Sequence, residues 1–562
     1  MSKYIFVVGG VMSGVGKGVA AASMGRILQG HGYQVSAIKI DPYINVDAGT
    51  MNPTEHGEVF VTEDGDETDQ DIGNYERFLG RNILSDNYMT TGRVYQTVIE
   101  RERNLEYGGK CVEVVPHIPE EIIYRIEQAT KKSEAEIMIV EVGGTIGEYQ
   151  NMLFLEAARM MKMHNFHDVI FVLVSYLPVP SKLGEMKTKP TQYAVRTLNS
   201  AGIQADFVLC RGEKPLDDIR KQKIAISGNL FPDHIISAPD VESIYDIPIN
   251  FSEEKIGQKI LKQFGWVPKL GAKGMADWQQ FLETAKAATE TVKIGIVGKY
   301  FKTGDFVLKD SYISVIEAVK HACWFHGKKP DIQWINCEVY ENDPAKLEEL
   351  KQYDGVIIPG GFGSRGIEGK ISAIQYLREN KIPFFGLCYG LQLATIEFAR
   401  NVCQIKDATS TEIDPDGEHQ VIHVMSGQIK NLQEGKYGST MRLGAYPCVL
   451  DEKSISYKAY NEKEISERHR HRYEVNNDYR QKLEDGGLLF AGQSPDCNLI
   501  EIIEVPDHPF FVGVQFHPEF KSRPIQGHPL FNAFIEACLG KEDSDKFEVE
   551  KKHDGNLSIT NY

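Results

Sequence analysis

A cysteine at the junction of a predicted strand and a predicted helix constrains this chain more than any other feature. The apolar run 383–387 leads into Cys388, and a helical pattern follows over residues 391–399. Gly386 and Gly390 flank the cysteine. We therefore expect the thiol on a tight strand-to-helix turn, where the helix N-terminus stabilises a thiolate and backbone N–H groups can face an oxyanion.

Two residues far downstream supply the partners that such a thiol needs. His517 and Glu519 stand two residues apart in the segment Gln-Phe-His-Pro-Glu. A histidine can act as base toward a thiol, and a carboxylate can orient the histidine, which is the arrangement of acyl transfer. The sequence thus predicts hydrolysis of a carboxamide at Cys388. The alternative is a buried structural thiol, which is common for cysteine, but the flanking glycines and the His-x-Glu spacing disfavour it.

Length and composition restrict the class of protein. A chain of 562 residues is too long for one core, so we expect two or more domains. The net charge of −17 argues against a broad nucleic-acid-binding surface. The sequence shows no signal peptide and no apolar run of about 18 residues, so a membrane span is not expected. Nine cysteines without metal-like or disulfide-like spacing fit reduced thiols and a cytoplasmic location.

Short apolar runs that alternate with helical patterns predict an α/β fold. Helical patterns over residues 18–29 and 152–164 lie between some of the candidate strands. The candidate strands are residues 4–8, 35–40, 137–142, 169–175, 207–210 and 235–237. This alternation predicts a P-loop-like, mostly parallel sheet that helices cover on both faces.

The composition changes along the chain predict its domain boundaries. We expect a first domain over residues 1–266 and a glycine- and proline-containing linker over 267–290. A second α/β domain, over residues 291–540, opens with the apolar strand 292–298. Residues 541–562 are charged and poor in apolar residues, which predicts a flexible tail.

The glycine-rich segment 9–18 predicts a phosphate-binding loop. Its glycines let the backbone wrap phosphate oxygens, and Lys17 adds a positive charge at the start of a helix. It departs from a strict Walker A motif because Gly18 replaces the Ser or Thr that binds Mg²⁺. Asp71 and Glu141 are then the candidate Mg²⁺ ligands, since hard carboxylate oxygens suit this ion. The alternative is a glycine-rich turn beside solvated acids.

A second polar segment, residues 182–192, combines lysines, threonines and a glutamine around Pro190. Such side chains offer charge and directional hydrogen bonds, which suit a second phosphate-binding or base-reading site. Lys39 ends a strand at the same expected sheet edge, where open α/β sheets bind ligands. The alternative is a lysine-rich loop that is merely solvated.

From residue 1 to about residue 540, the chain resembles the CTP synthase family. The motifs that carry the resemblance are GGVMSGVGKG, KIDPYINVDAGTMNPTEHGEVFV, GNYERFL, EVGGTIGE, KTKPTQ, PGGFGSRG, GLCYGLQ, ERHRHRYEVNN and GVQFHPEF. The resemblance implies an amidoligase domain joined to a class I glutamine amidotransferase domain, which together make CTP from UTP, ATP and glutamine. It also implies Mg²⁺, activation by GTP, feedback inhibition by CTP, and a homotetramer that can polymerise into filaments.

The resemblance implies a two-step chemistry. Glutamine is cleaved through a thioester on the cysteine, and the ammonia serves the amidoligase domain. There ATP phosphorylates O4 of UTP, and ammonia displaces the phosphate at C4. Direct attack at C4 would expel an oxide-like leaving group, so phosphorylation supplies a better one. Catalysis of the transfer is then mostly positioning and charge neutralisation.

The resemblance also assigns residues to the amidoligase site. ATP would be held by Gly14, Val15, Gly16, Lys17, Gly18, Val19 and Asp71, with Asp71 and Glu141 on Mg²⁺. UTP would be bound by Ser13, Lys187, Thr188, Lys189, Pro190, Thr191, Gln192 and Lys223. Lys39 would stabilise charge during phosphoryl transfer, and Glu148, Tyr149 and Gln150 would contact the product CTP.

In the glutaminase half, the resemblance makes Cys388, His517 and Glu519 catalytic. The implied glutamine-binding residues are Gly361, Tyr389, Gly390, Leu391, Gln392, Glu412 and Arg472. Arg365 lies where the family's GTP-responsive lid is expected.

Three places depart from the family pattern. Residues 148–151 are Glu-Tyr-Gln-Asn where the family commonly has Asp-Ile-Glu-Ser, a stretch that contacts the pyrimidine or ribose of the product. We therefore expect altered feedback inhibition by CTP with near-ordinary use of UTP. Ser364 and Tyr389 also differ from common family choices.

Two histidine-containing segments allow more than one interpretation. His469 and His471 alternate with arginines, which repel a metal cation, so we interpret this run as anion recognition or a salt-bridged surface. His56 either lines an ammonia path or is a satisfied polar histidine.

The sequence disfavours two rival functions. Another amidoligase with the same two modules, such as a cobyrinic-type amide synthetase, is disfavoured by the segment Lys-Thr-Lys-Pro-Thr-Gln at 187–192. A non-catalytic assembly protein is disfavoured by the presence of Lys17, Asp71, Glu141 and Cys388.

Overall fold

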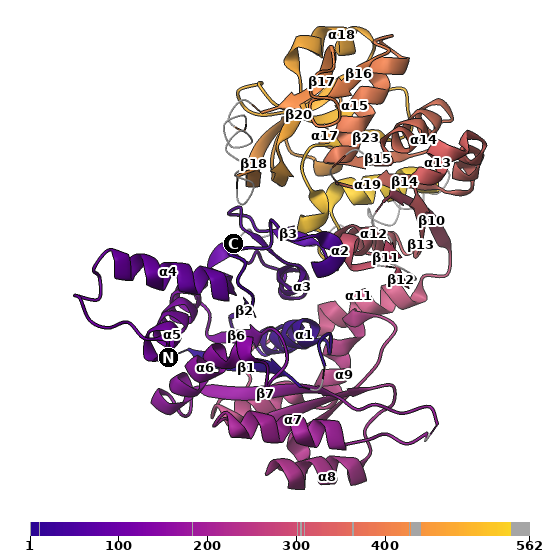
Figure 1. Ribbon diagram of the computed structural model, residues 1–562. Helices are drawn as coiled ribbons and strands as arrows, with labels where there is room; N and C mark the ends of the chain where they lie inside the picture. Colours follow the sequence, from indigo (N-terminus) through magenta and orange to yellow (C-terminus); the bar gives the residue numbers. More distant parts are fainter. Residues whose placement is uncertain are drawn as a thin grey trace. The chain divides into compact units, whose positions relative to one another are not determined.

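The computed structural model describes residues 2–540 except 11, 183, 300–301, 304–305, 308, 362, 364, 426–427 and 429–439. The predicted tail at 541–562 lies outside the described residues, as do Val11, Leu183 and Ser364. Contacts divide the chain into two compact units, which we describe separately (Figure 1). The first unit comprises residues 1–50 and 66–282, and the second comprises 51–65 and 283–562.

A seven-stranded sheet forms the centre of the first unit. Its strand order is β5-β2-β6-β1-β7-β8-β9, and every neighbouring pair is parallel. The strands of this unit are β1 (Lys3–Gly9), β2 (Val35–Asp41), β4 (Glu67–Asp69), β5 (Tyr88–Thr90), β6 (Ile137–Val142), β7 (Val169–Tyr176), β8 (Phe207–Gly212) and β9 (Ile235–Pro239). The predicted mostly parallel sheet is confirmed, and β5 is an edge strand that the sequence analysis did not identify.

Helices cover this sheet (Figure 1). They are α1 (Lys17–Gly30), α3 (Gln70–Leu79), α4 (Thr91–Arg103), α5 (Val114–Lys132), α6 (Met152–His164), α7 (Lys189–Ser200), α8 (Asp218–Gly228), α9 (Ile247–Glu253), α10 (Ile256–Gln263) and α11 (Ala276–Ala287). Strands β1, β2 and β6 are buried at nearly every position, as expected for strands with helices on both faces. Because the strands are parallel, their carboxyl ends share one edge, which carries the loops after β1, β2, β6 and β7.

The range 267–290 is more than the linker that the sequence predicted. It contains α11, whose Trp278 and Phe281 are buried. The Trp278 Nε1 donates a hydrogen bond of 2.9 Å to the Tyr245 carbonyl, and its ring lies 5.2 Å from that of Phe78. The segment is polar in sequence, but its aromatic side chains share one face of α11 and pack on the first unit.

A nine-stranded sheet forms the centre of the second unit, in the order β13-β10-β14-β15-β23-β22-β21-β18-β19. The strands from β13 to β23 in this order are parallel, and the remaining pairs are antiparallel. The strands of the unit are β3 (Val59–Val61), β10 (Thr291–Gly298), β11 (Lys302–Thr303), β12 (Phe306–Val307), β13 (Lys329–Asn336), β14 (Gly355–Ile358), β15 (Phe384–Leu387), β16 (Ala408–Ser410), β17 (His419–Val424), β18 (Arg442–Leu450), β19 (Glu464–His471), β20 (Tyr473–Val475), β21 (Leu489–Gln493), β22 (Ile500–Glu504) and β23 (Phe511–Val514).

The helices of the second unit are α2 (Pro53–His56), α12 (Ile313–Phe325), α13 (Glu338–Asn342), α14 (Ile367–Glu379), α15 (Tyr389–Asn401), α17 (Ile455–Tyr460), α18 (Arg480–Asp485) and α19 (Pro529–Leu539). The core lies between the sheet and helices such as α12, α15 and α19. The second predicted α/β domain is therefore present, and its antiparallel half had not been anticipated.

Residues 51–65 belong to the second unit although the sequence placed them in the first domain. The Arg468 guanidinium is fully buried, and its Nε lies 2.8 Å from the Glu63 carboxylate. Glu58 accepts hydrogen bonds from the backbone and hydroxyl of Ser314, next to the start of α12. Buried ionic and hydrogen-bonded contacts of this kind hold the segment on the second unit, which a continuous boundary at residue 266 cannot represent.

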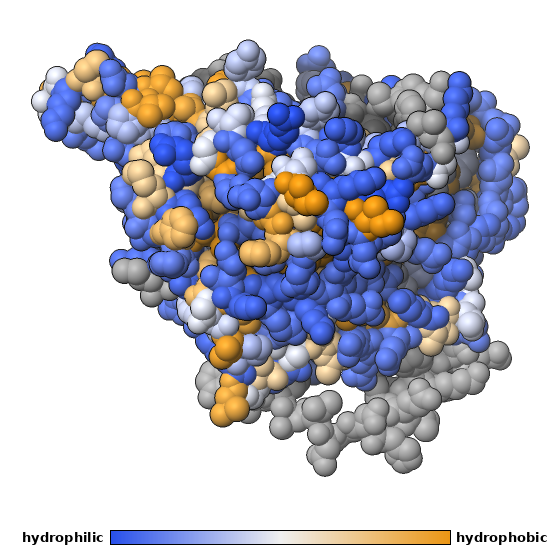
Figure 2. Space-filling model, turned by 90° about the horizontal axis from the view of Figure 1, so that it is seen from below, coloured by the Kyte–Doolittle hydropathy of each residue, from blue (hydrophilic) through white to orange (hydrophobic). Residues whose placement is uncertain are grey.

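Within the described part of the chain, no helix has the length and apolar character needed to cross a membrane. Figure 2 shows a face on which hydrophilic side chains predominate, with hydrophobic ones between them. Exposed apolar side chains on the first unit include Phe166, Tyr193 and Ile226. Exposed apolar residues that occur singly are ordinary on folded proteins.

Candidate functional site

The glycine-rich segment forms the turn between β1 and α1. Gly16 caps the helix with a φ of 80°, in the left-handed region that glycine adopts most readily. Lys17 is buried, and its Nζ donates a hydrogen bond of 2.8 Å to the Gly144 carbonyl at the end of β6. The lysine is therefore folded back over the carboxyl edge of the sheet, beside the helix N-terminus where an anion would bind.

Lys39 lies at the centre of a cluster of four carboxylates at this edge. It stands on β2 opposite Glu141 on β6, with 3.2 Å between its Nζ and the Glu141 Oε1. It also forms an ion pair with Asp71, and its Nζ lies 3.5 Å from Asp69 and 3.7 Å from Asp41. Four acids from three separate stretches of sequence thus meet one lysine.

The charges in this carboxylate cluster perturb one another strongly. Burial lowers the pKa of Lys39, but the surrounding carboxylates outweigh this effect and hold the pKa well above its usual value. Burial, opposed by Lys39 and reinforced by Asp41 and Asp71, raises the pKa of Asp69 to about 7. Burial also raises the pKa of Glu141. The acids remain crowded even with Lys39 between them, so the cluster can accept further positive charge.

Asp71 explains why Gly18 departs from the Walker A pattern. A side chain at Gly18 would collide with the Asp71 carboxylate, which occupies that space. Asp71 is held there by Lys39 and by the Asn74 amide, which donates a hydrogen bond of 3.1 Å. Although burial raises the pKa of Asp71, Lys39 holds it below its usual range. The carboxylate therefore occupies the space that a side chain at residue 18 would need.

The polar segment after β7 is only partly open to a ligand. Thr191 is buried, and its hydroxyl lies 2.8 Å from that of Ser175 on β7, which anchors α7 to the sheet. The Lys187 amine pairs with Glu185 at 2.8 Å. The remaining UTP-binding candidates are exposed or half-buried near the same edge: Ser13, Thr188, Lys189, Pro190, Gln192 and Lys223.

The segment that departs from the family pattern lies in the short helix Tyr149–Asn151 and the residue before it. The Tyr149 side chain is 91% exposed. The Gln150 amide donates a hydrogen bond of 2.8 Å to the Glu148 carboxylate. A side chain built on Gly144 would lie 2.7 Å from that carboxylate, so Glu148 faces the loop after β6.

A pocket of about 110 Å³ beside the phosphate loop was missed by the sequence analysis. Arg211 at the end of β8 contributes to its wall, donates to the Val15 carbonyl at 3.2 Å and pairs with Asp240 at 2.6 Å. Its lining residues include Gly16, Val19, Ala20, Arg211, Pro239, Val241 and Ile247. The order of the strands could have indicated this pocket, because β8 and β9 also end at the carboxyl edge of the sheet, where open α/β sheets bind ligands.

In the second unit, Cys388 occupies a strained turn between β15 and α15. Its φ of 50° and ψ of −98° are unusual for a residue other than glycine. A side chain on Gly390 would collide with the Ile358 carbonyl, so the sharp turn requires glycine there. The Cys388 N–H donates to the Val514 carbonyl at 2.7 Å, which fixes the turn to β23. The predicted strand–cysteine–helix arrangement is present.

His517 and Glu519 follow β23 and lie beside this cysteine. The His517 Nδ1 is 2.7 Å from the Glu519 Oε1. A side chain on Gly360 would lie 2.9 Å from the His517 ring and 3.7 Å from the Cys388 Cβ, so both residues border Gly360. Burial lowers the pKa of His517, but Glu519 and Cys388 outweigh it and raise the pKa to about 10. The imidazole is therefore protonated beside the thiol at neutral pH.

A cavity of about 90 Å³ opens at the cysteine. The Cys388 Sγ lies 3.7 Å from the Arg470 carbonyl and 3.7 Å from the Gln515 amide. The wall includes Pro53, Glu58, Val59, Tyr312, Gly360, Gly361, Cys388, Arg470, His517 and Glu519. Among the described residues, His56 does not line this cavity, although its neighbours in the segment 51–65 do.

The loop 360–366 joins several of the expected glutamine-binding residues. The Gly363 N–H donates to the Glu412 carboxylate at 2.8 Å, and the Tyr389 hydroxyl donates to the Gly363 carbonyl at 3.1 Å. Burial raises the pKa of Glu412, and Lys299 and the Gly363 N–H oppose this shift. Gly361 in the same loop lines the cavity at Cys388. Tyr389 and Glu412 therefore both bond to a loop that reaches this cavity.

The other expected glutamine-binding residues are less open. Gly390 and Leu391 are buried in α15. The Gln392 amide donates to the Tyr473 carbonyl at 3.0 Å, so this side chain supports the strand next to the site. Arg472 is half-buried and donates to the Thr440 hydroxyl at 2.7 Å. Arg365 is 70% exposed, and its guanidinium lies 2.6 Å from Glu338.

The expectation of a salt-bridged surface at the alternating His and Arg run is wrong for its histidines. His469 and His471 are buried on β19, with 3.0 Å between the His469 Nδ1 and the His471 Nε2. Burial and the Arg442 charge lower the pKa of His471 to about 3 and hold the pKa of His469 well below its usual value. Both rings point to the buried face of β19, and the His469 ring packs against Phe516, which the polar sequence did not suggest.

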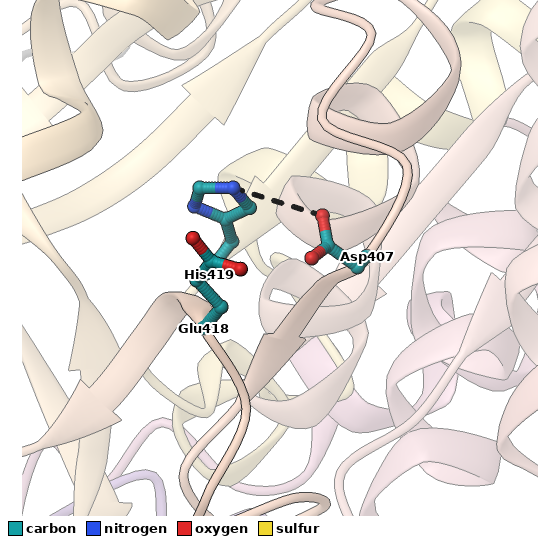
Figure 3. Close-up of side chains that lie close together, drawn as sticks. All are labelled: Asp407, Glu418 and His419. Carbon is teal, nitrogen blue, oxygen red and sulfur yellow. Dashed lines mark ion pairs between the residues drawn. The ribbon is translucent and has the colours of Figure 1, made fainter.

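Three potential metal ligands also meet in the second unit, at the starts of β16 and β17 (Figure 3). Asp407, Glu418 and His419 each place a ligand atom within 4.8 Å of the others, and the His419 Nε2 lies 3.8 Å from the Asp407 carboxylate. The Asp407 side chain is 60% exposed. Exposed pairs of this kind contribute little to stability, and we assign this group no part in the chemistry at Cys388.

Comparisons with known proteins identify two families along the chain. Residues 3–266 match the family described as CTP synthase N-terminus, and residues 307–537 match Glutamine amidotransferase class-I. The match over the first unit decides against the cobyrinic-type rival. A solved structure described as the Trypanosoma brucei CTPS glutaminase domain with bound acivicin is 36% identical, covers 44% of this chain and 94% of its own, and has a TM-score of 0.41.

Curated relatives match almost the whole chain. The CTP synthase of Caldanaerobacter subterraneus subsp. tengcongensis is 48% identical over 540 residues, which cover 96% of this chain and 98% of the relative. The CTP synthase of Pyrococcus furiosus is 49% identical over 540 residues, with the same two coverages. Glutamine-dependent conversion of UTP to CTP, with ATP as co-substrate, follows from this identity. The chain therefore belongs to the CTP synthase family of glutamine-hydrolysing ligases.

Proposed function

We propose that the second unit releases ammonia from glutamine through a thioester on Cys388. The thiolate attacks the carboxamide carbon, and the tetrahedral intermediate collapses to the thioester as His517 gives its proton to the leaving ammonia. Water then attacks the thioester, His517 takes up a proton from that water, and glutamate leaves as the C–S bond breaks and the thiolate is restored beside the protonated imidazole. The raised pKa of His517 supports this order, because the imidazole holds a proton before glutamine reacts.

Backbone and side-chain charges next to the cysteine suit the rest of glutamine. Tyr389 begins α15, and the first N–H groups of a helix have no carbonyl partner within that helix, so one of them can face the oxyanion. Gly361, which lines the cavity at Cys388, can supply the second N–H group. Arg472 suits the α-carboxylate of glutamine and Glu412 suits its α-ammonium group. Gly390, Leu391 and Gln392 keep the turn and the adjacent strand in place.

The first unit would then carry out the transfer of the γ-phosphoryl group of ATP to O4 of UTP, followed by attack of ammonia at C4. The first step forms an O–P bond and releases ADP; the second forms a C–N bond and releases phosphate. Lys17 and the turn at residues 14–19 would hold the phosphates of ATP, and the position of the Lys17 amine at the helix start supports this. Lys39, buried at the same edge, is placed to offset the charge that develops during transfer.

The residues at Lys39 fit a divalent cation. Among the residues that the structure describes, these four carboxylates have two ammonium groups beside them, those of Lys39 and Lys17. Burial raises the pKa of three of the acids. Asp71 and Glu141 would hold Mg²⁺, with oxygens of the kind that this ion prefers. When bound, the ion would neutralise phosphate charge. Asp71 reaches that position because Gly18 leaves room for it.

The pocket beside Gly16 is suited to the adenine of ATP. Its wall combines apolar side chains with the Arg211 guanidinium, which can stack on a flat ring. It adjoins the phosphate loop, as a nucleotide requires. UTP and CTP are assigned to Ser13, residues 187–192 and Lys223, and the CTP-specific contacts to residues 148–150.

Regulation and assembly are proposed from family membership. GTP would activate through the loop that carries Arg365, whose exposed guanidinium is available to an anion. CTP would inhibit by feedback, and the working form would be a cytoplasmic homotetramer that can polymerise into filaments.

The observation that carries this proposal is the strained turn at Cys388 beside the His517–Glu519 pair. The test is CTP formation from ATP and UTP, with glutamine or ammonia as nitrogen source, with and without GTP. Rapid acid quenching and intact-protein mass spectrometry should reveal a covalent glutamyl adduct on the wild-type chain. An adduct that persists in Cys388→Ala, or no adduct under single-turnover conditions, would contradict the thioester.

A further inference from the structure

Lys370 is a buried amine that the reaction described above does not use. It lies in the first turn of α14 and is 1% exposed. Among the residues that the structure describes, its Nζ has no hydrogen-bond partner. A lysine is almost never fully buried unless it is paired, because an unsatisfied charged group is costly in a protein interior. The position therefore calls for a functional explanation.

The Lys370 amine lies near the two residues proposed to supply the N–H groups of the oxyanion site, Tyr389 and Gly361. Its Nζ lies 5.4 Å from the centre of the Tyr389 ring, and Tyr389 follows the nucleophile directly. A side chain built on Gly361 would lie 4.0 Å from the same nitrogen, so the amine lies beneath this glycine. The Tyr389 hydroxyl also holds the Gly363 carbonyl of the same loop. The charge is thus placed behind the proposed oxyanion site.

The groups around Lys370 leave its charge uncompensated. Burial lowers the pKa of Lys370 to about 8, the Cys337 thiol opposes this shift, and the charge of Lys299 adds to it. The acids near Cys337 and Lys299 have other partners: Glu338 pairs with Arg365, Glu341 accepts the Gly369 N–H, and Glu412 accepts the Gly363 N–H. Near neutral pH the amine is largely protonated, and within the described part of the chain it has no partner carboxylate. Negative charge that develops on the substrate would compensate the positive charge of the Lys370 amine.

We propose that Lys370 is a positioning residue of the glutaminase site, whose buried positive charge acts through Gly361 and Tyr389 to stabilise the oxyanion of the tetrahedral intermediate. The inference rests on the thioester chemistry proposed for Cys388. In a dry site a fixed charge stabilises an oxyanion more than it would in water, and the amine is held in place before the reaction begins. A cation that forms no direct bond to glutamine should alter the rate of bond making more than ground-state binding.

The test compares full-length wild-type protein with Lys370→Met, which keeps the length of the side chain and removes its charge. We expect glutaminase kcat to fall about tenfold to hundredfold, below the loss for a direct oxyanion donor, while KM for glutamine changes less than about threefold. CTP synthesis from ammonia should be unchanged. The matched control is Lys346→Met, which removes an exposed lysine of the same unit. Cys388→Ala, measured alongside, reports whether the thioester chemistry itself is correct.

The pH dependence of glutaminase kcat distinguishes the proposed role of Lys370 from a purely structural role, which would not change it. In the wild type, glutaminase kcat should fall as the pH rises through about 8, because the amine loses its proton. In Lys370→Met, kcat should be low and nearly constant from pH 7 to 9. A variant with kcat within twofold of wild type, or with the same fall near pH 8, would overturn the inference. If the variant fails to fold, a wild-type kcat that stays constant from pH 7 to 9 would overturn it as well.

Discussion

The carboxylate cluster at Lys39 and the turn at Cys388 differ in how their charged and reactive groups are held in place. At Lys39, acids from the ends of β2, β4 and β6 and from α3 converge on one lysine, so the site depends on charges brought together from distant parts of the sequence. At Cys388, one strained backbone turn carries the nucleophile, and one His–Glu pair from far downstream lies beside it. The first site thus depends on four acids that surround one lysine, whereas the second depends on the backbone geometry of a single turn and on one pair of side chains.

This difference predicts how each site fails. Removing one charge at Lys39 leaves the other charges crowded and unpaired, so activity and the stability of the first unit should change together. Removing the thiol at Cys388 deletes a reacting atom while its backbone turn can persist. The variants below test whether the two sites are separable in this way.

The largest effect is expected for Cys388→Ala. CTP synthesis from glutamine should be abolished, while synthesis from free ammonia should remain near the wild-type rate, because the nucleophile belongs to the second unit alone. Steady-state assays with each nitrogen source measure the effect. Cys323→Ala, which removes a buried thiol away from the cavity, is a suitable control for loss of a thiol. Loss of ammonia-dependent activity in a folded Cys388→Ala protein would show that the sites are not separable.

Lys17→Ala should lower CTP synthesis by about a thousandfold with either nitrogen source. The phosphate charge in the transition state would lose its buried partner, and the Gly144 carbonyl would lose a hydrogen bond. Glutamine hydrolysis should continue. Lys131→Ala on the exposed face of α5 serves as the control. If Lys17→Ala made CTP from ammonia at the wild-type rate, the assignment of residues 14–19 as the phosphate-binding loop would be wrong.

Glu519→Gln should lower glutaminase kcat about hundredfold, since the imidazole loses its orienting carboxylate. The folded pKa of His517, about 10, exceeds the ordinary 6.5, because Glu519 and Cys388 outweigh burial. The pair therefore stabilises the fold fully below pH 6.5, and this contribution disappears as the pH rises toward 10. Thermal melts should show that the Tm deficit of the variant is largest near pH 6 and shrinks by pH 10. A constant deficit would mean that His517 is not protonated in the folded protein.

Gly18→Ser tests whether Asp71 has replaced the Walker A hydroxyl. The substitution restores the common residue, yet we expect CTP synthesis to fall at least tenfold, because the new side chain collides with the Asp71 carboxylate. Magnesium titrations of ammonia-dependent activity should show weaker apparent affinity. Combining it with Asp71→Ala relieves the collision, so the double variant should be no worse than Asp71→Ala alone. Full activity of Gly18→Ser would show that Asp71 can move freely.

The same contrast decides what the sequence could predict. The turn at Cys388 was predictable because its glycines are local, and the parallel sheet of the first unit was predictable because its strands are continuous apolar runs. The pairing of Glu141 with Lys39 was not, since it depends on β2 and β6 being neighbours in register. The placement of residues 51–65 on the second unit depends on contacts such as Arg468–Glu63, which join residues about 400 positions apart. No local pattern encodes such contacts.

The smallest effect concerns the segment at residues 148–150, where the chain departs from the family pattern. UTP and CTP share a triphosphate and differ at one exocyclic group, so both are expected to anchor through the same lysines. Discrimination must then come from the pyrimidine side of the site, where one polar contact is worth about 1–3 kcal/mol, or roughly tenfold in affinity. Tyr149 is almost fully exposed, and Gln150 holds the Glu148 carboxylate at 2.8 Å.

Restoring the family residues tests this segment directly. In the variant Glu148→Asp, Tyr149→Ile, Gln150→Glu, the amide that holds the acid at 148 is replaced by a second carboxylate. We expect the CTP inhibition constant to change by about tenfold, while the UTP concentration for half-maximal rate changes less than about threefold. Gln150→Glu alone should reproduce most of the change if the hydrogen bond to Glu148 positions the acid. Both constants follow from ammonia-dependent initial rates, which leave the Cys388 site out of the measurement. Unchanged inhibition by CTP in the triple variant would mean that residues 148–150 do not determine feedback. The triphosphate contacts that UTP and CTP share would then account for it.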